Sequence, residues 1–233
     1  MRSMVLYVLL EPARLGEDFW RRALPALSAD RQQKVLRFRF ARDRVLSAVA
    51  YLLLRLGLER EYGISGCPEC VFGPYGKPSL RNGEAGFSLS HCHQAVVCAL
   101  DRGEVGADVE HWTSFAPERL DTGMLERIFA PEELKAVQAA SNGPQAACAL
   151  WTAKESVCKY TGEGLRDDLP LVLHRTDVRV DTYGFGGRGL CAAVCRRARA
   201  GLAPLPRQVV TAGALRDFLR QCLNGTKGGK TGA

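Results

Sequence analysis

The stretch Val105-Gly106-Ala107-Asp108-Val109-Glu110 is the most informative part of this sequence, because it predicts both a strand and a charged face. In an extended chain, alternate side chains point to the same side. Asp108 and Glu110, two residues apart, would therefore present two carboxylates on one face of the strand. Taken alone, such an acid pair is more typical of a solvated sheet edge than of a metal site.

A second stretch, Trp151-Thr152-Ala153-Lys154-Glu155, is predicted to lie in a helix that extends past Lys159. A spacing of four residues places Trp151, Glu155 and Lys159 on one helix face. If this face meets the strand, three carboxylates converge, and like charges so close together are costly unless some protonate or a cation lies among them. Carboxylate oxygens suit a hard cation such as Mg²⁺, which completes its shell with water and substrate phosphate oxygens.

The composition is that of an ordinary globular protein, with 46% hydrophobic and 24% charged residues in a chain of 233. The apolar run Met4–Leu10 stops at Glu11, which makes it too short for a signal-peptide core or a membrane span. The nine cysteines are scattered and odd in number, which favours reduced thiols. We therefore expect a cytoplasmic protein that has no membrane partner.

Positive charge is concentrated in one short part of the chain, and the net charge is +7. A basic surface suits an anionic partner, such as a phosphate-rich ligand, an acidic protein or a nucleic acid. Ser28 is a plausible N-cap, so the basic run begins near a helix N-terminus, where backbone N–H groups also attract phosphate. The alternative interpretation is a solvated helix face. The basic residues are Arg31, Lys34, Arg37, Arg39, Arg42 and Arg44.

Helices and short strands alternate along the chain, which predicts the α+β class. Strands are predicted at 4–10, 86–90, 95–100, 105–110, 171–173, 178–180 and 190–195. Helices are predicted from Ser28, over Val45–Leu56, from Pro131, through Trp151 and Lys159 to Gly162 or Gly164, and over 215–222. The segments Ala95–Ala99 and Leu190–Cys195 each follow a helix-then-strand block of similar length, which suggests a duplicated α+β unit. We predict subdomains at 1–103 and 104–223 and a disordered tail at 224–233.

Five motifs, in this order and spacing, resemble the Sfp-type (surfactin-synthetase-activating) phosphopantetheinyl transferases, over about Leu24 to Leu169. They are Gly76-Lys77-Pro78, Phe87-Ser88-Leu89-Ser90-His91, Gly106–Glu110, Phe129-Ala130-Pro131-Glu132-Glu133 and Trp151–Lys159. The resemblance implies transfer of the 4′-phosphopantetheine arm of coenzyme A to a serine hydroxyl of an apo acyl or peptidyl carrier protein, with release of adenosine 3′,5′-bisphosphate. It also implies a pseudo-symmetric pair of α+β subdomains with the active site in the cleft between them.

The resemblance assigns a role to each matching residue. Mg²⁺ would be held by Asp108, Glu110 and Glu155, and Glu155, or a water that it orients, would be the base. Coenzyme phosphates would be bound by Ser90, His91 and Lys159, the 3′-phosphate by Arg31 and Lys34, and the nucleotide would lie beside Lys77. Catalytic roles are thus implied for Glu155, Lys159 and His91.

Two positions leave the assignment of ligand contacts open. Family members often carry Arg where this chain has Leu46; Arg44 is a candidate substitute, and Ser47 still offers a hydroxyl. Lys154 is either a ligand contact or an exposed neighbour of the motif.

Cys67-Pro68-Glu69-Cys70 invites a zinc or redox interpretation, but the chain has no second Cys/His pair at finger spacing, so we interpret both cysteines as loop thiols.

The main alternative function is a nucleic-acid-binding module that uses the Arg31–Arg44 face. Two features argue against it: the sequence has no aromatic stacking array, and the acidic motif residues would repel phosphate in the absence of a metal. An inactive scaffold of the same fold is disfavoured by the intact Asp108, Glu110, Glu155 and Lys159. We expect no nucleic-acid partner, a carrier protein with an acidic recognition surface, and a monomer, because a duplicated cleft within one chain needs no second subunit.

Overall fold

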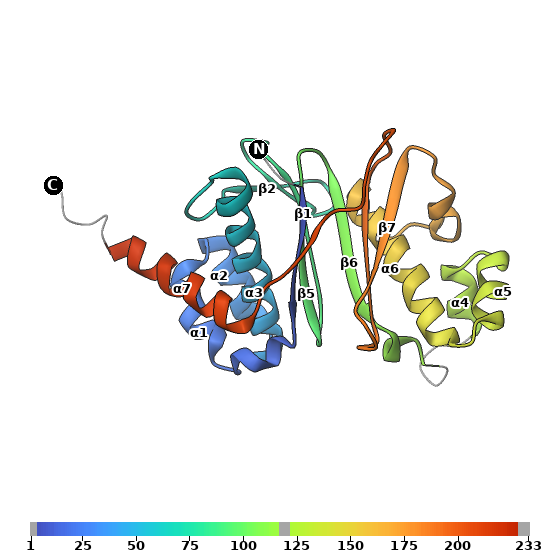
Figure 1. The fold of residues 1–233 in the computed structure, drawn as a ribbon, viewed down its shortest axis with the longest axis horizontal. Coiled ribbons are helices and arrows are strands. Elements are labelled where there is room, and N and C mark those ends of the chain that lie inside the picture. The colour runs from blue at the N-terminus through green and yellow to red at the C-terminus, as the bar shows by residue number, and fades with distance from the viewer. Residues whose placement is uncertain (1–3, 117–121, 228–233) are drawn as a thin grey trace.

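The chain folds into two sheets that face each other, with helices on the outer side of each (Figure 1). The computed structural model describes residues 4–116 and 122–227. Apolar side chains from both sheets fill the layer between them, among them Val8 and Val97 from one sheet and Val109 and Val194 from the other. The predicted α+β class is confirmed. Within the described ranges, no helix is both long enough and apolar enough to cross a membrane.

The sheet of the N-terminal half has the strand order β4-β5-β1-β9. Its strands are β1 (Val5–Leu10), β4 (Gly86–Cys92), β5 (Ala95–Asp101) and β9 (Arg207–Val209). Its helices are α1 (Phe19–Ala23), α2 (Ala29–Arg37), α3 (Ala41–Gly57) and α7 (Ala212–Lys227). A separate hairpin consists of β2 (Cys70–Phe72) and β3 (Pro78–Leu80). Short helical turns lie at Pro12–Leu15, Leu24–Ala26 and Leu58–Tyr62.

Local signals explain the helices of this half. The Ser28 hydroxyl accepts a hydrogen bond from the Arg31 backbone N–H at 3.4 Å, so the predicted N-cap of α2 is confirmed. The predicted helix over Val45–Leu56 is also confirmed and forms most of α3. Helix α3 is buried along most of its length, and Leu52 and Leu53 have no exposed surface. Its packing against β5 and β4 holds this half together.

The C-terminal half is built on an antiparallel sheet with the order β6-β8-β7. Its strands are β6 (Val105–His111), β7 (Val178–Gly184) and β8 (Leu190–Arg197), and its helices are α4 (Thr122–Ile128), α5 (Pro131–Ala139) and α6 (Gly143–Thr161). Short helical turns lie at Trp112–Phe115 and Leu169–His174. Asn142 caps α6 by accepting from the Gln145 N–H at 3.1 Å, and Gly162 ends it with a φ of 74°.

Helix α6 lies directly on β6 because the strand carries a glycine at the crossing point. A Cβ atom built on Gly106 would come within 2.0 Å of the Ser156 carbonyl oxygen and 2.3 Å of the Tyr160 nitrogen. Both of these atoms belong to the backbone and cannot rotate away. Only glycine therefore permits this approach, which brings the acidic face of β6 against the face of α6 that carries Glu155.

Three sequence predictions are wrong or incomplete. The predicted strand Leu171–Leu173 lies in the helical turn Leu169–His174, whose carbonyls at Leu169 and Pro170 bind the buried Lys154 ammonium rather than a neighbouring strand. The predicted helix at 215–222 is longer, because α7 continues through Lys227. The predicted tail from Asn224 is thus helical as far as Lys227, and 228–233 lie outside the described residues.

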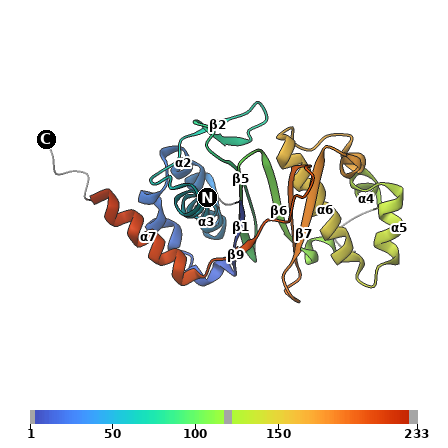
Figure 2. The same cartoon turned by 45° about the horizontal axis from the view of Figure 1, so that its top comes forward.

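The last part of the chain returns to the N-terminal half, contrary to the predicted division at 104–223. Strand β9 pairs parallel to β1, with Val209 opposite Val8. Helix α7 then lies beside α3, as Figures 1 and 2 show, and buries Leu215 and Phe218 in the same core as α3. The free edge of β1 and the exposed side of α3 supply this last segment with a hydrogen-bonding partner and an apolar surface.

We predict that Gly106→Ala lowers the free energy of unfolding by about 1–3 kcal/mol, because the added methyl group overlaps the backbone of α6. Gly184→Ala is the matched control, since a Cβ atom built on Gly184 in β7 meets nothing within 4 Å, and it should change stability by less than about 0.5 kcal/mol. Urea denaturation measures both values. Equal effects of the two substitutions would contradict the close approach of α6 to β6.

Candidate active site

Three elements that are distant in sequence line one acidic pocket. Strand β4 contributes Ser90 and His91, and strand β6 and helix α6 contribute the acids and a lysine. The volume of the pocket is about 280 Å³, and the predicted convergence of three carboxylates on one cavity is observed. The pocket is lined by Leu89, Ser90, His91, Asp108, Glu110, Trp151, Glu155 and Lys159.

Asp108 lies at the bottom of this pocket with only one of its two carboxylate oxygens paired. Oδ1 accepts from the Ser90 hydroxyl at 2.7 Å and from the Lys159 ammonium at 2.5 Å. Lys159 Nζ also lies 3.0 Å from Ser90 Oγ, which closes a triangle of polar groups. Oδ2 is buried and has no hydrogen-bond partner. Because an unpaired buried carboxylate oxygen is costly, this atom marks a place for a ligand.

The other two carboxylates, Glu110 and Glu155, have raised pKa values because their charged forms are disfavoured. Burial, and then the charge of Asp108, raises the pKa of Glu110 to about 7, although the Lys159 ammonium acts in the opposite direction. Burial also raises the pKa of Glu155, again against the effect of Lys159. One lysine therefore does not balance three acids, and the pocket favours either a proton or an added cation.

The residues fit a divalent hard cation by their chemistry, although they are not arranged around one in advance. In the described part of the chain, no three Cys, His, Asp or Glu side chains are close enough to form a metal cluster by themselves. The oxygen-only donor set, the unpaired Oδ2 of Asp108 and the excess negative charge all suit an ion that takes few protein ligands and completes its shell with ligand oxygens.

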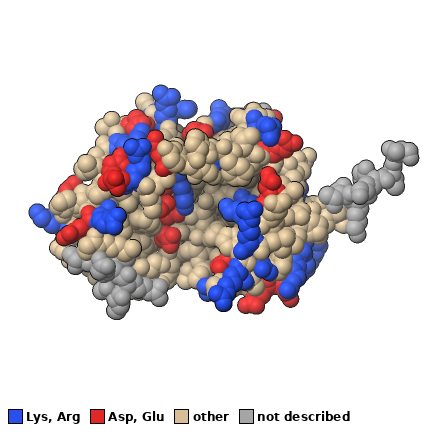
Figure 3. All heavy atoms as spheres, turned by 180° about the vertical axis from the view of Figure 1, so that it is seen from behind, with Lys and Arg blue, Asp and Glu red and all other residues tan. Residues whose placement is uncertain are grey.

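A second cavity, of about 330 Å³, adjoins the acidic pocket and has basic residues on its other side. Leu89, His91, Glu155 and Lys159 line both cavities. The basic residues are Arg31, Lys34 and Lys77. Figure 3 shows the hollow between the two halves, with carboxylates on one wall and Lys and Arg on the facing wall. A ligand that spans both cavities would meet cations at one end and carboxylates at the other.

The basic end is arranged to receive an anion. Arg31 stacks over the Tyr51 ring, and its Nη1 lies 3.5 Å from the Ser47 hydroxyl. Burial lowers the pKa of the Arg31 guanidinium, which means that its charge lacks a compensating partner. Burial, and then the positive charge of Lys159, also lowers the pKa of His91, so its imidazole is neutral at neutral pH.

Lys77 joins the two halves beside this cavity. Its ammonium pairs with Glu104 and donates to the Tyr160 carbonyl at 2.8 Å. Its aliphatic chain covers Gly162, where a Cβ would come within 2.8 Å of Lys77 Cδ. The β3 end of the N-terminal half is thereby fixed to the C-terminal end of α6.

Comparison with known proteins places the chain in one superfamily. A family model of the 4′-phosphopantetheinyl transferase superfamily matches residues 104–195. A 4′-phosphopantetheinyl transferase of Bacillus subtilis is 32% identical over 166 residues, which cover 69% of each chain. This chain belongs to the 4′-phosphopantetheinyl transferase superfamily.

Other relatives extend this result to a second bacterial protein and to a fungal one. The 4′-phosphopantetheinyl transferase Sfp of Bacillus subtilis strain 168 is 27% identical over 173 residues, which cover 72% of this transferase and 74% of the relative. An L-aminoadipate-semialdehyde dehydrogenase-phosphopantetheinyl transferase of Eremothecium gossypii is 32% identical over 188 residues, which cover 72% of this chain and 66% of the relative.

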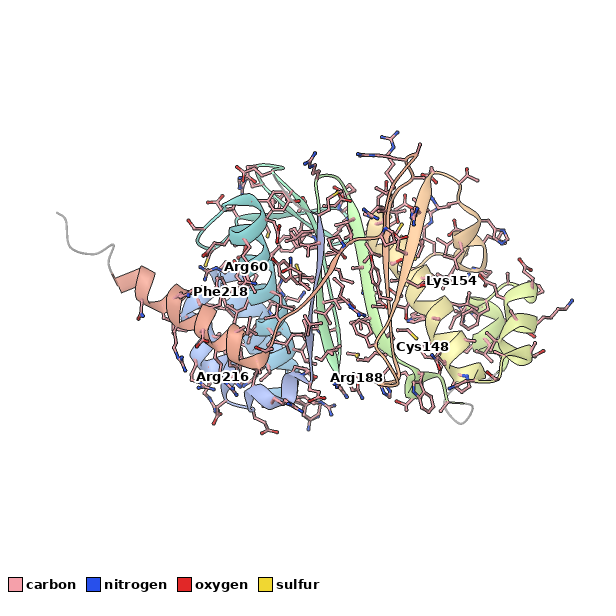
Figure 4. All side chains as sticks on the ribbon, viewed as in Figure 1. Arg60, Cys148, Lys154, Arg188, Arg216 and Phe218 are labelled. Carbon is pink, nitrogen blue, oxygen red and sulfur yellow. The ribbon has the colours of Figure 1, made fainter. Side chains whose placement is uncertain are left out.

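Two predicted ligand contacts of this transferase lie away from both cavities. Lys154 is fully buried on another side of α6, where its ammonium meets Glu133 Oε2 at 2.9 Å and the Leu169 and Pro170 carbonyls (Figure 4). Arg44 donates from Nε to the Phe38 carbonyl at 2.9 Å and stacks over the Trp20 ring. Neither side chain lines either cavity, because each is held by its own partners.

Sequence reasoning missed two residues that position the site. The Ser88 hydroxyl accepts a hydrogen bond from the Ala107 N–H at 2.9 Å. This bond attaches β4 to β6 next to the contact between Ser90 and Asp108. Glu133 caps α5 through the Ala130 N–H at 2.8 Å and also pairs with Lys154. The alternation of Ser88 and Ser90 along β4 was the only available signal, since the partner of Glu133 is distant in sequence.

We predict that Lys154→Met destabilises the transferase by about 3–5 kcal/mol, because it leaves the Glu133 carboxylate buried without its charge partner. The exposed Lys135 on α5 is the matched control, and Lys135→Met should change stability by less than about 0.5 kcal/mol. Chemical denaturation measures both. The folded Lys154→Met protein should bind coenzyme A as the parent does, and weakened binding would contradict the structural role.

Proposed function

We propose that this transferase moves the 4′-phosphopantetheine arm of coenzyme A to a serine hydroxyl of an apo acyl or peptidyl carrier protein and releases adenosine 3′,5′-bisphosphate. Membership of the superfamily supports the reaction class. The observation that carries the proposal for this chain is the pair of joined cavities, one basic and one acidic, that share His91, Glu155 and Lys159.

The basic cavity is proposed to bind the nucleotide end of coenzyme A. Arg31 and Lys34 line this cavity beside the hydroxyl of Ser47, and we propose that they pair with the 3′-phosphate. Lys77 and the turn at Tyr75 and Gly76 line the same cavity and would flank the nucleoside. The half-buried Arg31 gains most from this pairing, because a bound phosphate supplies the negative charge that it lacks.

The acidic pocket is proposed to hold the diphosphate. Asp108, Glu110 and Glu155 would bind Mg²⁺, which when bound supplies the positive charge that offsets the diphosphate and the leaving bisphosphate. The Lys159 ammonium, already placed beside Asp108 and Ser90, adds a point charge for the same oxygens. Ser90 and His91 supply hydrogen-bonding groups at the boundary between the two cavities.

The reaction itself needs a base and a correct line of attack. The serine oxygen of the carrier forms a new bond to the phosphorus that bears the pantetheine arm, and the bond from this phosphorus to the leaving bisphosphate breaks. Glu155, whose pKa burial raises, is proposed to take the serine proton, directly or through a water molecule. The other residues contribute positioning and charge stabilisation, which dominate phosphoryl transfer.

The nucleic-acid alternative is not favoured. Of the basic run, Arg31 and Lys34 line the cavity and Arg44 is held by Phe38 and Trp20, so these cations do not form one open stripe. We further propose that the transferase is a cytoplasmic monomer whose carrier protein has an acidic recognition surface, in keeping with its net charge of +7. All nine cysteines lie in the described ranges and are free thiols.

We predict that the protein adds the mass of the phosphopantetheine arm to an apo carrier protein in the presence of coenzyme A and Mg²⁺. Glu155→Ala should lower the rate at least about 10²-fold at every Mg²⁺ concentration, whereas excess Mg²⁺ should partly rescue Asp108→Ala. Glu59→Ala, which removes an exposed carboxylate outside both cavities, is the control. Substantial activity of Glu155→Ala would contradict its role as base and ligand.

We also predict that Arg31→Ala and Lys34→Ala each weaken binding of coenzyme A about tenfold or more, because each removes a charge-assisted contact to the 3′-phosphate. The same variants should bind 3′-dephospho-coenzyme A as the parent does. Isothermal titration with both compounds measures the difference. Arg44→Ala is the control and should bind both unchanged; equal weakening of both compounds by Arg31→Ala would place the 3′-phosphate elsewhere.

A further inference from the structure

Two cysteines from distant parts of the sequence meet behind the acidic pocket. Cys148 lies on α6 and has no exposed surface, and Cys191 lies on β8 and is 9% exposed. Both belong to one small apolar cluster with Phe115, Phe129 and Ala147. Figure 4 shows Cys148 where α6 faces the strands of the C-terminal half. Neither thiol takes part in the proposed transfer.

The contacts of Cys191 place its sulfur against the turn of α6 that carries Cys148. Cys191 Sγ donates to the Gln145 carbonyl at 3.9 Å. In a helix, the carbonyl of one residue lies next to the side of the residue three positions later, which here is Cys148. The interaction of each thiol with the other is the main cause that raises the pKa of Cys148 and lowers that of Cys191.

We propose that Cys148 and Cys191 form a redox pair that closes to a reversible disulfide and covalently joins α6 to β8. In the reaction with hydrogen peroxide, both S–H bonds and the O–O bond break, one S–S bond forms, and two water molecules leave. The sulfurs lose two electrons and the peroxide oxygens gain them. A dithiol reductant reverses the step by thiol–disulfide exchange.

The position of the pair gives the bond a structural consequence. Cys191 lies directly opposite Glu110 in the register of β6 and β8, so the two side chains share the face of the sheet that meets α6. Helix α6 carries Glu155 and Lys159. The disulfide therefore fastens together the two layers that form the acidic pocket, and it closes a long loop of chain, which restricts the unfolded state more than a short loop does.

The test is peptide mapping of the full-length protein, first reduced, then treated with hydrogen peroxide under native conditions, alkylated and digested with trypsin. Residues 136–154 form a tryptic peptide that contains Cys148 alone, and residues 189–196 form one that contains Cys191 and Cys195. We expect these two peptides as a linked species that lacks two hydrogens and disappears on reduction. Fragmentation within Ala192–Val194 assigns the link to Cys191.

Variants and a thermal measurement complete the experiment. The linked species should persist in Cys195→Ala and be absent from Cys191→Ala, and oxidation should raise the thermal midpoint of the parent by several degrees but not that of Cys148→Ala. The tryptic peptide of residues 61–81, which contains the exposed Cys67 and also Cys70, reports whether the oxidant acted; trypsin does not cleave between Lys77 and Pro78. The proposal is overturned if Cys67 is oxidised without any linked species, if the link involves Cys195, or if the link forms without raising the midpoint.

Discussion

The contact between α6 and β6 at Gly106 is the constraint on which the rest of the site depends. Without a side chain at this position, the backbone of the helix lies on the backbone of the strand. Every second residue of β6 and every fourth residue of α6 lie on the faces that meet at this contact, and these two faces together form one pocket. A larger residue would separate Asp108 from Lys159, whose 2.5 Å contact anchors the polar triangle with Ser90.

Charge is distributed across the molecule in a way that packing alone would not favour. Three carboxylates gather on one wall of the hollow, and desolvated cations stand on the other, so each wall is less stable empty than with a counter-ion. Glu110, with its pKa raised to about 7, and the unpaired Oδ2 of Asp108 are the clearest signs of this cost. Two facing walls of opposite charge suit a substrate that carries several phosphates together with a bound cation.

The two halves are joined by more than the apolar layer between their sheets. Ser88 links β4 to the backbone of β6, Lys77 links the β3 end to α6, and the chain returns at β9 and α7 to complete the first half. These connections fix the width of the cleft from several sides. The site therefore lies between two supports that are held together through hydrogen bonds as well as through packing, which suits catalysis by positioning.

Periodicity was sufficient to predict the acidic face of β6, the face of α6 with Glu155 and Lys159, and the long helix α3, because such patterns are local. The surroundings of a side chain are not local. The sequence could not show that Lys154, one residue before Glu155, pairs with Glu133. Nor could it show that Leu171–Leu173 lies in a helical turn next to the carbonyls that bind Lys154, or that β9 pairs with β1. Those outcomes depend on residues far apart in the chain. Such residues become neighbours only in the folded protein, where buried charges need partners of opposite charge and sheet edges need hydrogen-bonding partners.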